Sequence, residues 1–238
     1  MRATGLSLSA EVPGLLRGSV VEGRAALESF DARRWWFHGA IILGGAGLFG
    51  AAVGSWRDPL QAFYTALKLP LVILLTSLGN GLLNAMLAPL LGINLNLRQS
   101  LLAVLMSFTI AAVILGAFSP LLYFLIWNTP ALATGASTNT GAHSLVLLCE
   151  TAIIAFAGIA ANVRLLQLLR ELAGSASAAQ KVLFAWLAGN LLLGSQLAWI
   201  MRPFVGSPGL PVQFLRANPF EGSFYESIFR AFRHLFFS

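Results

Sequence analysis

The dominant pattern in the chain is a series of long apolar runs separated by short polar segments. Five runs approach or exceed the roughly 20 residues that a helix needs to cross the hydrocarbon core of a bilayer. They span residues 37–54, 70–92, 101–126, 144–161 and 182–201. This pattern predicts an all-α fold, a polytopic transmembrane helical bundle of about five spans with additional short interfacial helices.

The tryptophans support these span boundaries. An indole ring is stable in the headgroup layer, where its apolar body meets lipid and its N–H meets water. All six lie near the ends of the runs, namely Trp35, Trp36, Trp56, Trp127, Trp186 and Trp199. We therefore expect them at the membrane surface.

The polar segments divide the chain into three regions. Residues 1–34 carry four acids and are predicted to form a polar N-terminal arm, and residues 35–202 form the transmembrane domain. Residues 203–238 are too polar to cross and contain a candidate amphipathic helix, which Ser223 and Glu226 begin with a capping box. Its apolar face indicates either a helix in the headgroup plane or a docking helix for a partner.

Residues 58–68, between the first two runs, are predicted to form a short interfacial helix. Asp58 suits the N-cap, and Pro59 suits the first helical position. Apolar residues then recur at positions 60, 63, 64 and 67, which is helical spacing. The segment is too short to cross a membrane by itself.

The first apolar run is rich in small residues. Ala46, Gly50 and Gly54 are four residues apart, which lets another helix backbone approach closely. The alternative is that glycine is simply tolerated in lipid. Gly45, Gly47 and Gly50 also match Gly-x-Gly-x-x-Gly, but no strand precedes them and no distal acid follows. A dinucleotide site is therefore excluded.

Composition narrows the class of protein and its partners. The 238 residues are 57% hydrophobic and 10% charged, which is too few charges to cover a water-facing surface. The net charge of +6 is spread over termini and loops, without the dense basic stripe that binds nucleic acid. Such charges suit anionic lipid headgroups. We expect membrane lipids, other membrane proteins or a second copy of the chain as partners, and no nucleic acid.

The distribution of basic residues predicts the orientation in the membrane. With the N-terminus in the cytoplasm, five spans place nine basic residues inside and six outside. Basic residues accumulate in cytoplasmic loops, so the sequence favours this orientation. The basic tail opposes it, and a re-entrant run would move the tail inside.

Polar side chains in and beside the runs are the candidate functional residues. Glu150 is the acid within a run, and an intramembrane acid indicates function by default. Five spans place Glu150 in the same half of the membrane as Lys68, Thr76 and the end of the last run. The candidate polar site comprises Lys68, Thr76, Asn80, Asn84, Glu150, Asn190, Gln196 and Arg202.

Two interpretations of Glu150 stay open at this stage. In the functional one, it binds a proton or a cation, or lines a polar cavity for a lipid headgroup. In the structural one, it forms an ion pair with Arg202 or Lys68, or stays neutral and hydrogen-bonds across helices.

No residue pattern indicates catalysis or a cofactor. His38, His143 and His234 are far apart, and Cys149 is the single cysteine, so no metal centre is expected. The chain has no paired carboxylates, Gly-x-Ser-x-Gly, His-Glu-x-x-His or phosphate-binding loop. We predict no metal, no cofactor and no enzymatic activity.

A motif at the end of the last run is distinctive. It reads Gln-Leu-Ala-Trp-x-x-Arg-Pro-Phe at residues 196–204, and Ser-Phe-Tyr-Glu follows at residues 223–226. Together with Lys-Leu-Pro-Leu at residues 68–71, it resembles a family of bacterial polytopic membrane proteins with no established activity. The resemblance implies a bacterial inner membrane and brings no catalytic residues. The five-span plan is also distantly similar to Yip1-type proteins, but the chain lacks their Asp-Leu-Tyr-Gly-Pro motif.

These observations predict an integral membrane scaffold or accessory subunit that acts through contacts with lipid and membrane proteins. The alternative is a small transporter or channel with a polar path around Glu150. A lipid-modifying enzyme ranks third, because the residues offer no catalytic arrangement.

Overall fold

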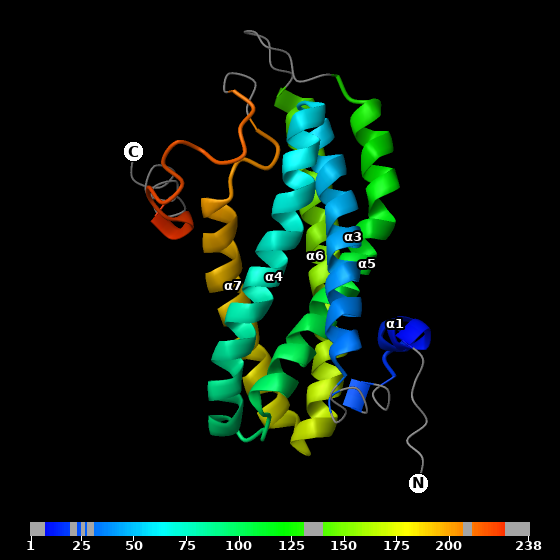
Figure 1. Cartoon of the computed structure of the whole chain (residues 1–238), viewed down its shortest axis with the longest axis vertical. Coiled ribbons are helices and arrows are strands. Elements are labelled where there is room, and N and C mark those ends of the chain that lie inside the picture. Colours follow the sequence, from blue (N-terminus) through cyan, green and yellow to red (C-terminus); the bar gives the residue numbers. More distant parts are fainter. Residues whose placement is uncertain are drawn as a thin grey trace.

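The computed structural model describes residues 8–19, 23–24, 27, 31–130, 140–206 and 211–226. Every regular element within these residues is a helix, and Figure 1 shows them as one upright bundle. The helices are α1 (Leu8–Arg17), α3 (Ala32–Ser55), α4 (Pro59–Leu90), α5 (Leu97–Trp127), α6 (Thr140–Ala173) and α7 (Ala176–Ile200). Helices α3 to α7 are long and apolar enough to cross a membrane, which confirms the predicted all-α fold and the number of spans.

Successive helices run in opposite directions, so the chain enters the bundle at its lower end and leaves it at its upper end (Figure 1). Helix α3 packs against both α4 and α5, while α7 packs against α4 and α6. Helix α5 also contacts α6 and α1. The tail therefore begins beside the upper part of α4, far from the N-terminal arm.

Helix α4 corrects the prediction for residues 58–68. These residues do not form a separate interfacial helix, because α4 continues through Pro70 to Leu90. Asp58 caps it, accepting a hydrogen bond from the backbone N–H of Leu60 at 2.8 Å. Proline within a membrane helix is tolerated when neighbouring groups satisfy the freed carbonyl. At 1.5 Å per residue, the 32 residues reach about 48 Å, so α4 tilts or projects beyond the roughly 30 Å hydrocarbon core.

The small residues of α3 lie where neighbouring helices come closest. A Cβ at Gly50 would lie 2.5 Å from the carbonyl oxygen of Thr65, and one at Gly54 would lie 2.5 Å from that of Gln61. Ala46 is fully buried in the same helix. Because a side chain larger than hydrogen has no room at either glycine, these two positions set the separation of α3 and α4.

The tryptophans differ in how far they are buried within the bundle. Trp36 and Trp127 are 82% and 89% exposed, but Trp186 is 1% exposed. Trp186 belongs with Ala179 and Val182 to the buried face of the lower half of α7. The position of a residue in an apolar run does not reveal which face of the helix it occupies, and Trp186 packs inside the bundle.

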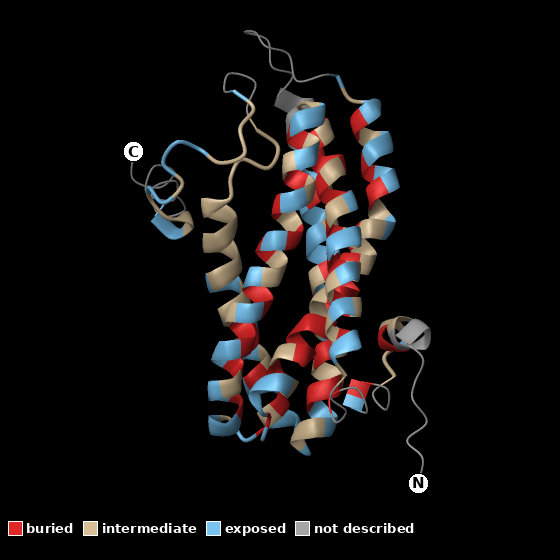
Figure 2. Ribbon diagram, viewed as in Figure 1, coloured by how far each residue is buried: buried red, intermediate tan, exposed pale blue. Residues whose placement is uncertain are grey.

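The N-terminal arm joins the bundle where the structure describes it. Leu15 of α1 and Leu27 are buried in the same apolar cluster as the core of α5. Figure 2 shows that buried residues of the long helices face the inside of the bundle, while exposed residues lie on its outside. The predicted amphipathic helix of the tail lies outside the described residues beyond Glu226, whose N–H donates to Ser223 Oγ at 3.1 Å.

Candidate functional site

One face of α4 carries a line of buried polar side chains, which the buried apolar Val72 interrupts. They follow helical spacing of three, four and eight residues, so they line one side of the helix. We call this line the α4 polar stripe: Gln61, Thr65, Lys68, Thr76, Asn80 and Asn84, each at most 3% exposed. Polar groups in a membrane helix turn toward protein partners, and here those partners are α7 and the tail.

The upper end of the stripe grips the beginning of the tail. Lys68 Nζ donates to the carbonyl oxygen of Pro203 at 2.7 Å. Gln61 Nε2 donates to the same oxygen at 3.0 Å and to the carbonyl oxygen of Phe204 at 2.7 Å. Thr65 Oγ1 also donates to Phe204, at 2.6 Å. We call these three side chains of α4 the tail clamp, because they hold two consecutive carbonyls of the tail.

Aromatic rings enclose the ammonium group of Lys68. Its Nζ lies 4.9 Å from the ring centroid of Phe214, 5.9 Å from that of Tyr64 and 6.0 Å from that of Phe204. The negative faces of aromatic rings attract a cation, and the attraction grows when water is excluded. Lys68 is fully buried and forms no ion pair with a described residue. Its positive charge is therefore balanced by one carbonyl and three rings.

The middle of the stripe joins α4 to α7 through a chain of amides. Asn80 Nδ2 donates to Asn190 Oδ1 at 2.6 Å and to the carbonyl oxygen of Trp186 at 3.1 Å. Asn84 Nδ2 donates to Asn80 Oδ1 at 3.0 Å. Gly189 faces Asn80 so closely that a Cβ would collide with its Oδ1. Both N–H groups of Asn80 are thus used, and the chain fixes the register of the two helices.

Beside the amide chain, Thr76 faces Gly194 of α7. A Cβ at Gly194 would lie 3.6 Å from Thr76 Oγ1, and this oxygen has no hydrogen-bond partner in the described part of the protein. Thr76 therefore extends the polar stripe without joining the hydrogen-bonded chain.

A second set of contacts ties the tail to the outside of α7. Gln196 Oε1 accepts from the backbone N–H of Phe224 at 3.4 Å, and the Tyr225 hydroxyl lies 2.7 Å from Ser195 Oγ. Tyr225 also donates to the carbonyl oxygen of Leu191 at 3.0 Å. Because Leu191 lies more than two turns before the end of α7, the tail folds back along this helix.

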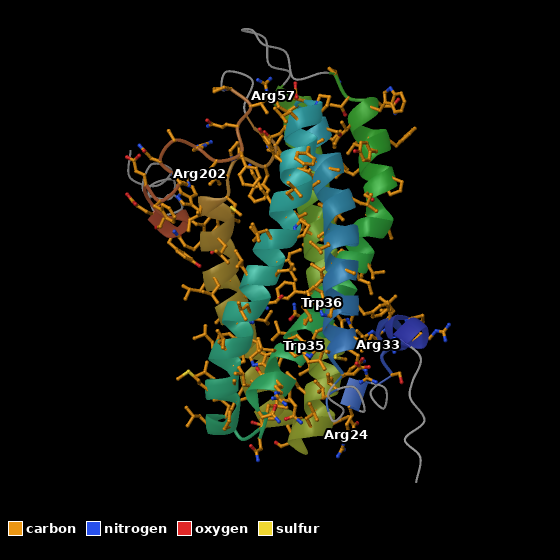
Figure 3. All side chains as sticks on the ribbon, in the orientation of Figure 1. Arg24, Arg33, Trp35, Trp36, Arg57 and Arg202 are labelled. Atoms are coloured by element: carbon orange, nitrogen blue, oxygen red, sulfur yellow. The ribbon has the colours of Figure 1, made fainter. Side chains whose placement is uncertain are left out.

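Arg202 strengthens this fold-back. Its guanidinium lies 3.7 Å from the ring centroid of Trp199 and donates to the carbonyl oxygens of Trp199 at 2.6 Å and Glu221 at 3.3 Å. Figure 3 shows Arg202 at the upper end of α7, where the tail begins. Burial lowers the pKa of Arg202, the nearby charge of Arg216 lowers it further, and Glu221 raises it. Arg202 therefore serves the tail itself, with its charge directed at backbone carbonyls.

The predicted polar residues thus do not form a single site. Lys68 belongs to the tail clamp, Asn80, Asn84 and Asn190 form the amide chain, and Gln196 and Arg202 contact the folded-back tail. The predicted ion pair of Glu150 with Lys68 or Arg202 is absent, and Glu150 makes no hydrogen bond to any residue that the structure describes. The reason is topological, since α6 packs against α5 and α7 while Lys68 is held on α4 by the tail.

Sequence reasoning missed Gln61, Thr65, Phe204 and Phe214. The signal for the first two was present, because positions 61, 65 and 68 continue the spacing of 76, 80 and 84 along one helix. Treating 58–68 as a separate element concealed it. Phe214 carries no such signal, since it reaches Lys68 only after the tail has turned back.

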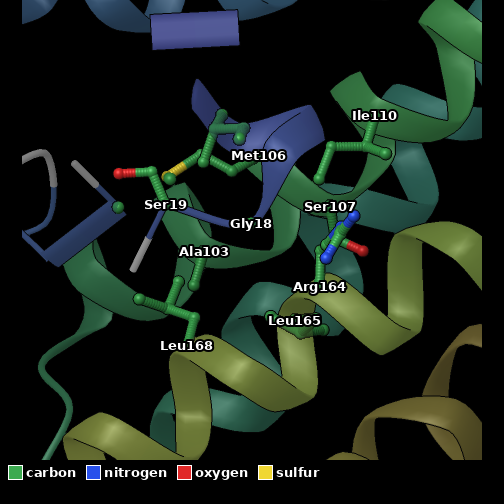
Figure 4. A pocket seen from close by; sticks show the side chains of 11 residues that line it. Gly18, Ser19, Ala103, Met106, Ser107, Ile110, Arg164, Leu165 and Leu168 are labelled. Carbon is green, nitrogen blue, oxygen red and sulfur yellow. The ribbon is translucent and has the colours of Figure 1, made fainter. Parts of the chain in front are cut away.

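A buried histidine and a small pocket lie apart from the polar stripe and the tail. His38 Nδ1 lies 3.0 Å from Thr109 Oγ1 in the interior and joins α3 to α5. A small pocket lies where the arm crosses α5 and α6, lined mainly by apolar side chains such as Met106 and Leu168, with Arg164 at its edge (Figure 4). Among the described residues, no three histidines, cysteines or acids gather to hold a metal.

Comparison with known proteins adds no further constraint on function. No protein-family model, no curated protein and no solved structure matches the chain.

Substituting Asn80 with alanine is expected to destabilise the bundle by about 1–2 kcal/mol. The change removes the amide that joins the two helices, so the side chains of Asn84 and Asn190 lose their partner on residue 80. Thermal unfolding in detergent measures the effect. Asn162→Ala is the matched control, because the Asn162 amide bonds only Gly158 of its own helix. Equal losses for both variants would contradict a cross-helix role for Asn80.

Proposed function

We propose that the protein is an integral membrane scaffold or accessory subunit whose C-terminal tail is a fixed contact surface for another membrane protein. The observation that carries this proposal is the tail clamp. Gln61, Thr65 and Lys68 are fully or almost fully buried. Gln61 donates to the carbonyls of Pro203 and Phe204, and Lys68 and Thr65 each donate to one of them. A loose terminal segment needs no such anchoring, whereas a recognition surface gains affinity from being held in one shape.

The described part of the tail has side chains suited to such a contact. Phe220 is 79% exposed and Tyr225 is 39% exposed, with Arg216 also on the surface. Aromatic residues and arginine are enriched where proteins meet. We place this surface on the outer side of a bacterial inner membrane, with the N-terminus in the cytoplasm. Arg98 near the start of α5, Arg170 near the end of α6 and Lys181 near the start of α7 agree with this orientation, because these three helix ends lie at the lower end of the bundle.

Lys68→Glu tests the proposal without shortening the chain. In the full-length, affinity-tagged protein purified in mild detergent, we expect this variant to lose a partner that co-purifies with the wild type. The matched control is Lys181→Glu, which makes the same charge change at an exposed position of α7. The mass of each complex gives the readout. A partner retained in full by Lys68→Glu, when its tail is demonstrably released, would overturn the proposal.

The second candidate function is a small transporter or channel. Glu150 supports it, because a buried intramembrane acid without a partner is a feature of ion and proton pathways. Under this alternative, Glu150→Gln abolishes flux through reconstituted vesicles while the complex of the scaffold test stays intact.

A further inference from the structure

Glu150 takes no part in the contacts that hold the stripe, α7 and the tail together. Its side chain is 6% exposed, and its Oε1 atom is buried without a hydrogen-bond partner. It lies on the face of α6 that carries Val146, Ala157 and Ala161, all of them apolar and buried. The carboxyl group is therefore seated in the apolar seam of α6.

The arginine and lysine side chains of α5, α6 and α7 lie in the lower half of the bundle, away from Glu150. Helix α6 packs against α5 and α7. The other titratable or basic residues of the three helices are Arg98, Tyr123, His143, Cys149, Arg164, Arg170, Glu171 and Lys181. All the arginines and the lysine lie in the lower halves of these helices, while Glu150 lies in the upper half of α6. His143 is seven residues nearer the upper end, about 10 Å along the helix axis.

The upper halves of α5 and α7, which flank Glu150, contain few titratable side chains. On α5 the titratable residue is Tyr123, which is 40% exposed and follows buried Leu122. Residues 188–200 of α7 contain no titratable side chain, and Cys149 is the neighbour on α6 itself. Among described residues, nothing near Glu150 offers the positive charge that an ionised carboxylate in an apolar site requires.

We propose that Glu150 is a proton-binding site, seated between α6 and its neighbours and in exchange with the upper membrane surface. A carboxyl group without a cationic partner enters an apolar environment by carrying a proton. The apolar segment of α6 begins at Leu145, so Glu150 lies only about 8 Å below it, close enough for exchange. A metal ion needs several oxygen ligands, and the described residues contain no group of three histidines, cysteines or acids that could supply them. This site is separate from the tail clamp. Proton binding there would be a property in addition to the proposed scaffold function.

Labelling with dicyclohexylcarbodiimide tests the proposal on the full-length protein in lipid vesicles. A protonated carboxyl transfers its proton to the reagent nitrogen while its oxygen bonds to the central carbon, and the adduct rearranges to a stable N-acylurea. A water-exposed glutamate is protonated in only about 1 in 500 molecules at pH 7. We therefore expect Glu150 to be labelled on the order of a hundredfold more than exposed Glu171. Mass spectrometry of peptides locates the adducts, and labelling of Glu150 should fall as the pH is raised.

Two results would overturn the assignment. The first is a Glu150 that stays unlabelled at neutral pH, or is labelled no more than Glu171. The second is protection by sodium chloride but not by choline chloride, which would assign the site to a sodium ion. Glu150→Gln supplies an independent readout, because the amide has the shape of the protonated acid. The infrared carbonyl band of a protonated carboxyl should be present in the wild type and missing in this variant.

Discussion

Replacing Lys68 with glutamate is expected to release the tail from α4. The new carboxylate would face the carbonyl oxygens of Pro203 and Phe204 and the negative faces of the surrounding rings. A hydrogen bond to a charged group is worth about 1.5–3 kcal/mol, and its loss alone shifts the equilibrium between docked and released tail by roughly 10- to 150-fold. Repulsion adds to this shift.

Limited trypsin digestion in detergent measures the release. Arg216 lies in the described tail, and cleavage after it should accelerate in Lys68→Glu but not in the control Lys181→Glu. Lys68→Met should give an intermediate rate. It removes the ammonium group without adding repulsion, and Gln61 still donates to both carbonyls. If all three variants are cleaved at the wild-type rate, the tail clamp does not hold the tail.

Much of the fold could be predicted because the physical signal is local. Apolar length alone predicts the five membrane helices, and a cap residue predicts where one of them begins, as Asp58 does for α4. The predicted division between residues 58–68 and the run at 70–92 was wrong. Proline usually ends a helix in water, but packing and the surrounding apolar environment carry α4 through it. The error divided the polar stripe in two and hid Gln61 and Thr65.

The candidate site could be predicted only in part because its partners are backbone carbonyls. A sequence displays side chains, so Glu150 is the obvious partner for Lys68. The structure pairs Lys68 with the carbonyl of Pro203, a group that every residue possesses and no pattern marks. The motif at residues 196–204 contains Phe204, but the ring of Phe214 lies near Lys68 only because the tail turns back.

The glycines of α3 connect the packing of the bundle to the tail. Gly50 contacts the backbone of Thr65, and Gly54 contacts the backbone of Gln61, so both touch α4 at residues of the tail clamp. Gly45 instead meets the backbone of Ala112 on α5. The separation of α3 and α4 therefore determines where two of the three clamp side chains begin.

Gly54→Ala is accordingly expected to have two effects. A methyl group would lie 2.5 Å from the carbonyl oxygen of Gln61 and 2.7 Å from the Cα of Ala62, which forces the helices apart. Overpacking of this kind costs about 1–3 kcal/mol, measured as a lower thermal stability in detergent. Because Gln61 moves with α4, trypsin cleavage after Arg216 should also accelerate.

Two control substitutions on the same helix separate these effects. Gly44→Ala has no atom within 4 Å of the new methyl group, so both stability and cleavage should stay at wild-type values. Gly45→Ala collides with α5, so it should lower stability while the folded protein keeps its tail protected. If Gly45→Ala and Gly54→Ala release the tail equally, release reports general loosening of the bundle. The α3–α4 contact would then have no specific influence on the clamp.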